Sequence, residues 1–206
     1  KIISITKQSY CKEINNSKLV GEFQIKNLLM AILAGKLSML KDKKIYSVLN
    51  QIQPINGRLS LTRTLPNNTK VFIDYAHTPD ALENSLKTLK NYYKKDITLV
   101  FGCGGERDQT KRPIMAKVAN KYSNKIIVTD DNPRSENPSK IRKQILKYTK
   151  KNINYNISNR SLAIKKAITE SKTNEIIIIA GKGHENIQDY GNIIYKISDK
   201  QIVNEL

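Results

Sequence analysis

The amino-acid sequence predicts an α/β protein with a Rossmann-like, mostly parallel, doubly wound sheet. Short β-rich runs alternate with helical stretches from residue 58 onward, which is the pattern of such folds. The runs at 97–100 and 176–179 are rich in aliphatic residues rather than alternating with charged ones, as expected of parallel strands that are covered on both faces. Polar and glycine-rich clusters follow several of the strand candidates, where ligands bind in sheets of this class.

The first part of the chain has helical periodicity. Apolar residues recur at Ile25, Leu28, Leu29, Ile32 and Leu33, which predicts an amphipathic helix over 24–36. A weaker stripe of the same kind covers 45–52. The turn-forming segment 54–57, Pro-Ile-Asn-Gly, then breaks the pattern. We therefore expect two domains, at 1–55 and 56–206.

The second part predicts the alternating elements of the sheet. Strands are expected at 59–64, 71–75, 97–101, 125–129, 153–157, 175–180 and 193–197, and helices at about 79–93, 113–122, 138–149 and 159–171. Asn137 followed by Pro138 is a favourable helix start, with a capping side chain and a proline at the first helical position. Residues 198–201, Ser-Asp-Lys-Gln, resemble a capping box for a short final helix.

The charge balance is strongly basic. The 206 residues contain 36 Lys and Arg against 18 Asp and Glu, a formal net charge of +18. Such a charge can indicate a nucleic-acid partner. The basic residues are scattered, however, and Lys, Asn and Ile are all abundant, as in a protein from an AT-rich coding sequence. We expect no nucleic-acid partner and keep a basic nucleic-acid-binding module as an alternative.

The cysteine positions and the lengths of the apolar runs indicate the cellular compartment of the protein. Cys11 and Cys103 are far apart and lack metal-ligand spacing, which favours a reducing compartment without a disulfide framework. The longest aliphatic run is far shorter than the ~18 residues of a membrane span, and no signal peptide opens the chain. We therefore expect a cytoplasmic protein without a membrane partner. Lys1 in place of Met indicates that the chain starts inside a longer protein.

Four loops after strand candidates concentrate polar residues, at 74–79, 102–108, 130–134 and 181–185. Each has a simpler interpretation. Thr78 and Pro79 can be a plain helix start. The glycines can form an ordinary turn, and 131–134 can be an Asx turn closed by proline. His77 and His184 are not at metal-ligand spacing, and the Gly-Lys pair at 181–182 lacks the other residues of a P-loop.

Taken together, the motifs resemble the carboxyl-terminal domain of Mur ligases. The match rests on VFIDYAHTPDALENSLKTLK…LVFGCGGERDQTKRPIM at 71–115, TDDNPRSENP at 129–138 and AGKGHENIQ at 180–188. LVGEFQIKNLLMAI at 19–32 resembles the end of that family's central ATPase domain, and Asn56-Gly57-Arg58 resembles the start of its last domain. The resemblance covers nearly the whole chain after residue 19.

The resemblance implies an ATP-dependent amide ligase. Mur ligases convert a carboxylate of a UDP-linked muramoyl peptide into an acyl phosphate, which the amine of an incoming amino acid attacks. The peptide here would be UDP-N-acetylmuramoyl-L-alanyl-D-glutamate. The carboxyl-terminal domain would supply the amino acid and close over ATP held mainly by the central domain, of which 1–55 would be the end.

The Asp-Asn-Pro-Arg motif resembles the family's diaminopimelate-recognition motif. The distal end of meso-diaminopimelate carries a carboxylate and an ammonium, and arginine forms a two-pronged bond with carboxylates that lysine cannot imitate. Substrate lysine lacks the distal carboxylate, so it would leave this arginine unpaired. The expected binding residues are Arg107, Asp131, Asn132, Pro133, Arg134, Gly181 and Glu185.

The resemblance also implies contacts with ATP, from Asn27, Arg58, Asp74, Tyr75 and His77. Arg58 would face the phosphates and Asp74 the ribose, whereas Gln24 stands where the family usually has Asn. The chain has neither a Gly-Lys-Thr/Ser loop nor the lysine that the family carbamoylates for Mg²⁺ binding. We therefore expect no catalytic residue or metal ligand in this chain, with ATP and Mg²⁺ bound mainly upstream. The chain is expected to be a monomer that is inactive alone.

Other members of the same superfamily are the nearest alternatives. A lysine-adding Mur ligase or a folylpolyglutamate synthase would share the fold. The motifs at 131–134 and 181–185 argue against both.

Overall fold

The computed structural model describes residue 19, residues 22–150 and residues 152–206, and it divides the chain into two compact units. The first unit ends at Pro54 and the second begins at Ile55. Cys11 lies outside the described residues. No helix in the described part of the chain has both the length and the hydrophobicity to cross a bilayer.

The described part of the first unit is helical. It contains α2 (Glu22–Leu37), α3 (Asp42–Ser47) and a 3₁₀ turn η2 (Leu49–Gln51). The apolar stripe expected from the sequence is the face that packs, with Leu28, Leu29 and Ile32 buried against Ile45 and Leu49. Asn27 lies on the exposed side of α2.

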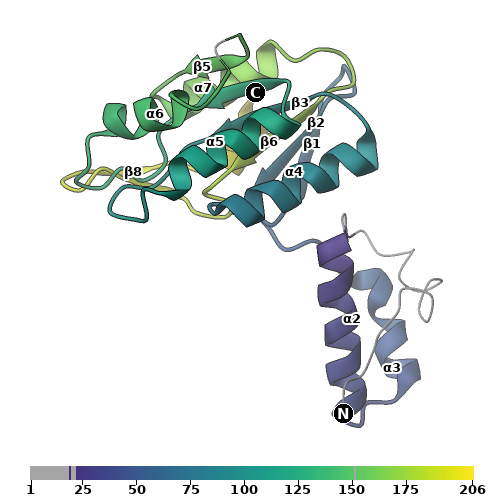
Figure 1. The fold of residues 1–206 in the computed structure, drawn as a ribbon. Coiled ribbons are helices and arrows are strands. Elements are labelled where there is room, and N and C mark those ends of the chain that lie inside the picture. The colour runs from purple at the N-terminus through teal and green to yellow at the C-terminus, as the bar shows by residue number, and fades with distance from the viewer. Residues whose placement is uncertain (1–18, 20–21, 151) are drawn as a thin grey trace. The chain divides into compact units, whose positions relative to one another are not determined.

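The second unit is built on a six-stranded sheet in the order β1-β2-β6-β3-β4-β5 (Figure 1). The strands are β1 (Ser60–Thr64), β2 (Lys70–Asp74), β3 (Ile97–Phe101), β4 (Lys125–Val128), β5 (Asn154–Asn156) and β6 (Ile176–Ala180). All neighbours are parallel except β1, which pairs antiparallel with β2 at the edge. The prediction of a mostly parallel α/β sheet is confirmed.

Helices cover both faces of this sheet. They are α4 (Pro79–Tyr93), α5 (Lys111–Tyr122), α6 (Pro138–Leu146), α7 (Arg160–Thr169) and α8 (Asp199–Glu205). Helices α4, α5 and α6 pack side by side, whereas α7 packs with α8. The crossover from β5 to β6 runs back across the sheet, opposite to the crossovers from β2 through β5. Because such crossovers are right-handed, the reversal places α7 on the other face.

The predicted helix-capping side chains form the expected hydrogen bonds. Thr78 accepts a hydrogen bond from the Ala81 backbone N–H, and Asn137 accepts one from that of Lys140. Ser198 likewise caps α8 through the N–H of Gln201. The sheet core consists of strands β3 and β6, whose residues are all buried.

The strand expected at 193–197 lies outside the main sheet. Strand β8 (Ile194–Lys196) instead pairs with β7 (Ile187–Asp189) in a separate antiparallel hairpin. The sequence analysis did not predict β7. It has only three residues, too few to show the apolar periodicity that identifies longer strands.

Candidate functional site

The polar loops meet at one edge of the sheet. Strands β2, β6, β3 and β4 are adjacent and parallel, so their carboxyl ends point the same way. The Gly181 N–H donates to the carbonyl of Asp74 at 3.1 Å, which joins the loops after β6 and β2. The Gly105 N–H donates to the carbonyl of Asn132 at 2.9 Å, which joins the loops after β3 and β4.

Two glycines permit this close approach. A side chain at Gly105 would overlap the carbonyl of Pro133, with its Cβ at 2.8 Å from the carbonyl carbon. Gly181 has φ +115°, and a Cβ there would lie 2.5 Å from Oδ2 of Asp131. Only glycine tolerates both the backbone conformation and the lack of space at Gly181.

Asn132 lies at the centre of the loop cluster and is 8% exposed. Its Oδ1 accepts hydrogen bonds from Lys182 Nζ at 2.8 Å and from the backbone N–H of Asp189 at 3.1 Å. Its Nδ2 donates to Oε2 of Glu185 at 3.0 Å. Two donors face the oxygen and one acceptor faces the nitrogen, so the network determines the orientation of the amide.

Lys182 and Glu185 form an ion pair beside Asn132. Lys182 Nζ lies 3.1 Å from Oε2 of Glu185, with the lysine side chain 1% exposed and that of glutamate 29% exposed. Burial alone would raise the pKa of Glu185. The Lys182 ammonium, together with hydrogen bonds from Asn132 and Tyr75, holds that pKa below its ordinary value. Glu185 is therefore an anion at neutral pH.

Arg134 supplies a cation next to this anion. Its backbone has φ +53°, and its N–H donates to the carbonyl of Asp189 at 2.9 Å. Its Nη1 donates to the carbonyl of Gly105 at 2.8 Å, and its Nε lies 3.8 Å from Oδ2 of Asp189. The side chain remains 24% exposed, so a ligand can reach it.

The remaining predicted amino-acid-binding residues lie close by. Arg107 is exposed. A Cβ atom placed on Gly104 would lie 3.9 Å from Cγ of Arg107 and 3.1 Å from Nη1 of Arg134, so both arginines lie close to this glycine. Asp131 accepts the N–H of Asn132 at 2.8 Å, and Pro133 is buried against Gly105. The cluster thus contains two guanidinium groups, of Arg107 and Arg134, and the carboxylates of Asp131 and Glu185.

A buried ion pair stabilises the glycine-rich loop that follows β3. Arg112 of α5 is fully buried and contacts both carboxylate oxygens of Glu136, at 3.0 and 3.1 Å. Arg112 also donates to the carbonyl of Gly104 at 3.2 Å, and Glu136 accepts the N–H of Glu106 at 2.7 Å. The pair ties the loop after β3 to the loop after β4.

A second cluster, formed by Arg58, Tyr75, His77 and His184, is centred on the Tyr75 ring in the loop after β2. The guanidinium carbon of Arg58 lies 4.4 Å from the centre of the Tyr75 ring. The rings of His77 and His184 lie 4.7 and 5.6 Å from the same ring. His77 also bonds through Nδ1 to the carbonyl of Tyr75 at 2.9 Å. This cluster combines a planar cation over the Tyr75 ring with one edge-on and one tilted histidine ring.

Asp74 serves the local structure. Its Oδ1 accepts the backbone N–H groups of Leu59 and Tyr75, at 3.0 and 2.8 Å, and its Oδ2 accepts the Ser85 hydroxyl. Burial raises the pKa of this carboxyl, although these hydrogen bonds and Arg58 oppose the rise. The side chain is 5% exposed, so it holds the loop in place and presents little surface to a ligand.

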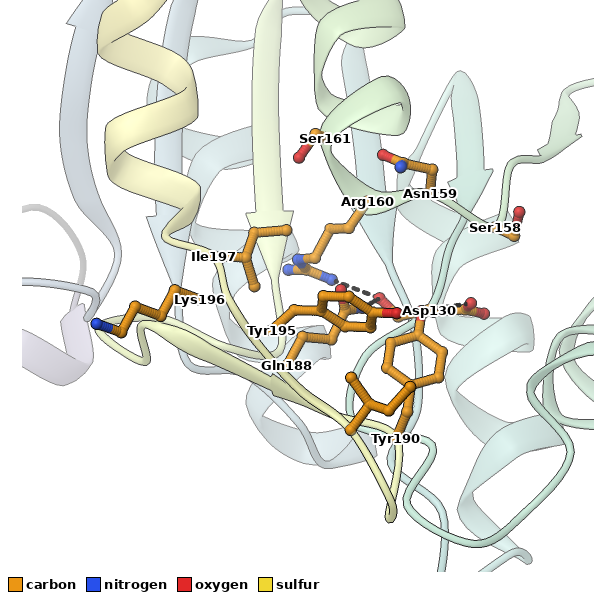
Figure 2. A pocket seen from close by; sticks show the side chains of 11 residues that line it. Asp130, Ser158, Asn159, Arg160, Ser161, Gln188, Tyr190, Tyr195, Lys196 and Ile197 are labelled. Carbon is orange, nitrogen blue, oxygen red and sulfur yellow. Dashed lines mark hydrogen bonds between the residues drawn. The ribbon is translucent and has the colours of Figure 1, made fainter.

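The β7–β8 hairpin is fastened to the end of β4. Tyr190 donates to a carboxylate oxygen of Asp130 at 2.9 Å, and Gln188 donates to the carbonyl of Asp130 at 3.1 Å. A cavity of about 560 Å³ lies between this hairpin and the start of α7, and Figure 2 shows Tyr190 and Tyr195 bordering it beside Asp130. Arg160 lies in its wall, in a fully buried ion pair with Asp199 at 2.7 Å.

The sequence analysis missed several members of the site. Lys182 lay within a quoted motif, but its role as a buried ion-pair partner was not assigned. Asp189 belongs to the short strand β7, which carried no periodic signal. Arg112 and Glu136 lie 24 residues apart and meet only in the fold. Among the described residues, no group of three or more His, Cys, Asp and Glu side chains is placed to hold a metal ion.

The fold is an α/β domain whose polar loops gather at the carboxyl ends of its parallel strands. The family model described as "Mur ligase, glutamate ligase domain" matches residues 57–183. The chain belongs to the Mur ligase family.

Three similar proteins carry the same name. The chain is 42% identical over 193 residues to UDP-N-acetylmuramoyl-L-alanyl-D-glutamate–2,6-diaminopimelate ligase of Rickettsia felis, covering 93% of this chain and 36% of that protein. It is 44% identical over 202 residues to the ligase of the same name from Buchnera aphidicola subsp. Schizaphis graminum, covering 96% and 40%. A solved structure of a ligase of that name matches with TM-score 0.71 and 34% identity over 92% of this chain and 39% of the other. The chain thus spans well under half the length of these relatives.

Proposed function

We propose that this chain selects meso-diaminopimelate for an ATP-dependent ligase that adds it to UDP-N-acetylmuramoyl-L-alanyl-D-glutamate in peptidoglycan synthesis. The observation that carries the proposal is the juxtaposition of Arg134 with Asn132 and Glu185. A planar cation and an anion lie on adjoining loops, and both bond Asn132: Arg134 donates to its backbone carbonyl, and Glu185 accepts from its side-chain Nδ2. The names of the relatives support the same reaction.

The distal end of the amino acid fits this arrangement chemically. Its carboxylate would pair with Arg134 and Arg107, and its ammonium with Glu185 and Asp131. The guanidinium of Arg134 is oriented by the carbonyls of Gly105 and Asn132, so two-pronged binding of a carboxylate requires little rearrangement. Pro133 and Gly181 would shape the walls, since both lie at close backbone contacts.

We assign ATP contacts to the second cluster. Arg58 stacked on Tyr75 offers a cation to phosphate groups, and His77 borders the same ring. ATP would supply the phosphoryl group that activates the muramoyl-peptide carboxylate. Asp74 would hold the loop that carries Tyr75. Mg²⁺ would be bound mainly by residues outside this sequence.

The selectivity of binding tests the proposal. We expect Arg134→Ala to weaken meso-diaminopimelate binding by about 2–5 kcal/mol, the range for breaking a desolvated charge pair. L-Lysine binding should change little, because lysine has no distal carboxylate. Arg134→Lys should restore only part of the loss, since an ammonium lacks the two-pronged geometry. Isothermal titration calorimetry of the 206-residue chain with both amino acids measures these effects.

Lys165→Ala is the matched control. It removes one positive charge from an exposed position on α7 and should leave both affinities unchanged. Equal weakening of both amino acids by Arg134→Ala would show that Arg134 is structural and would remove the basis for the diaminopimelate assignment.

A further inference from the structure

We propose that Lys182 is a positioning residue for amino-acid selection, which fixes the amide of Asn132 and the carboxylate of Glu185 for a ligand that it does not itself touch. The inference rests on the proposed function of the site and adds a residue to it. Three observations carry it: the burial of Lys182, its two partners, and the way in which those partners are left facing the site.

Lys182 is too buried to serve as a solvent-facing cation. Its side chain is 1% exposed, and its Nζ donates to Oδ1 of Asn132 and Oε2 of Glu185 at 2.8 and 3.1 Å. A buried ammonium is costly unless it is paired and hydrogen-bonded. The sequence places this lysine between Gly181 and Gly183, both with positive φ, so the backbone turns the side chain inward at this point.

The pairing with Asn132 decides which atom of the amide the ligand meets. Oδ1 of Asn132 already accepts from Lys182 and from the N–H of Asp189. Both of its acceptor positions are therefore used, and Nδ2 is the atom left to interact further. Asn132 then acts toward the ligand as a donor, which suits the carboxylate end of a distal amino-acid group.

The pairing with Glu185 decides where the ligand ammonium can bind. Oε2 of Glu185 is shared by Lys182 and Asn132, so neither of these side chains occupies Oε1, toward which we expect the ligand ammonium to bind. Lys182 also stabilises the ionised form of this carboxyl, as the lowered pKa of Glu185 indicates. The carboxyl of Glu185 thus stays ionised to a lower pH than that of an ordinary glutamate.

Other charged or titratable groups that face Glu185 do not replace this effect. Tyr75, after β2, donates a hydrogen bond to it, and Arg160 at the start of α7 interacts with it electrostatically. Asp131, after β4, is a like charge on the neighbouring loop. Arg160 is already committed to Asp199, which leaves Lys182 as the cation in direct contact with Glu185.

The test is an NMR titration of the ligand-free 206-residue chain with labelled glutamate carboxyl carbons. In Lys182→Met, which keeps the length of the side chain and removes its charge, the titration midpoint of Glu185 should rise by about one pH unit or more. Lys165→Met, an equal charge change on the exposed side of α7, should leave the midpoint where it is. An unchanged Glu185 midpoint in Lys182→Met would overturn the proposal.

The affinity for meso-diaminopimelate is the second measurement that tests the role of Lys182. We expect Lys182→Met to weaken meso-diaminopimelate roughly tenfold at pH 7.5 and further at pH 5.5, because a hydrogen bond to a charged group is lost and Glu185 becomes protonated at higher pH. Lys165→Met should bind as the unsubstituted chain does at both pH values. If the unsubstituted chain binds no diaminopimelate, the proposed function fails, while the ligand-free titration still tests the role of Lys182.

A third measurement keeps the proposal testable if Lys182→Met does not fold. The Nζ of Lys182 in the unsubstituted chain should give a slowly exchanging ammonium signal in ¹H–¹⁵N spectra, as a buried and hydrogen-bonded group does. A lysine Nζ that exchanges as fast as that of Lys165 would contradict the buried geometry and the proposal with it.

Discussion

At the scale of single residues, the adjacent glycines Gly104 and Gly105 have different neighbours: backbone for Gly105 and a binding-site side chain for Gly104. A methyl group at Gly105 would collide with the backbone carbonyl of Pro133. A methyl group at Gly104 would meet the Nη1 of Arg134 at 3.1 Å, the far end of a flexible side chain. The same substitution at neighbouring positions therefore perturbs different parts of the site.

We expect Gly105→Ala to lower the free energy of unfolding by about 2–3 kcal/mol, because a packed backbone has to move. Gly104→Ala should cost much less stability but should displace the guanidinium of Arg134 and weaken meso-diaminopimelate binding. Urea unfolding and calorimetric titration of the two variants measure both quantities. Equal effects of the two substitutions on stability and on binding would contradict the arrangement described for this loop.

At the scale of elements, a buried ion pair connects the first residues of two neighbouring helices. Arg160 begins α7, Asp199 begins α8, and neither side chain is exposed. Arg160 also donates to the carbonyl of Ala180 at the end of β6. The pair therefore holds together the two helices on one face and the strand that leads into the 181–185 loop.

Asp199→Asn should destabilise the second unit by about 3–5 kcal/mol, since it leaves Arg160 buried without its countercharge. Glu170→Gln is the comparison, because Glu170 pairs with Lys125 and Lys166 at the surface and its loss should change little. Thermal unfolding followed by circular dichroism distinguishes the two. A stability loss no larger for Asp199→Asn than for Glu170→Gln would contradict the assigned role of this pair.

The elements also show what the sequence could and could not predict. Continuous apolar runs and capping residues predicted β3, β6 and α4 because those signals are local. The strand at 193–197 was predicted, but its pairing with β7 was not, because β7 has only three residues and no apolar periodicity. For the site, motif spacing predicted which loops matter, but the pairing of Arg112 with Glu136 and the links from Lys182 and Asp189 to Asn132 depend on contacts between loops that no local pattern contains.

At the scale of the whole molecule, the second unit carries the cluster assigned to ATP, with Arg58, Tyr75 and His77. The 206 residues contain no Gly-Lys-Thr/Ser phosphate-binding loop. The formal charge of +18 is spread along the chain, and anionic substrates with several carboxylates and phosphates are partners that suit it without nucleic acid.

We expect the purified 206-residue chain to release no phosphate from ATP above background, with or without UDP-N-acetylmuramoyl-L-alanyl-D-glutamate and meso-diaminopimelate. The physical reason is that the loop that cradles the β- and γ-phosphates is absent from this sequence. A coupled phosphate-release assay measures it, with Arg58→Ala as a control for contaminating ATPases. Sustained turnover that Arg58→Ala abolishes would show that this sequence holds a complete ATP site.

The central claim is that the loops after β3, β4 and β6 form the amino-acid site, and an NMR map of the ¹⁵N-labelled chain titrated with meso-diaminopimelate tests it most directly. We expect the perturbed signals to fall at 102–108, 131–134 and 181–189, with much smaller changes for L-lysine around Arg134. Perturbations centred instead on the cavity between the hairpin and the start of α7, around Ser161 and Tyr195, would contradict the claim. So would indistinguishable maps for the two amino acids.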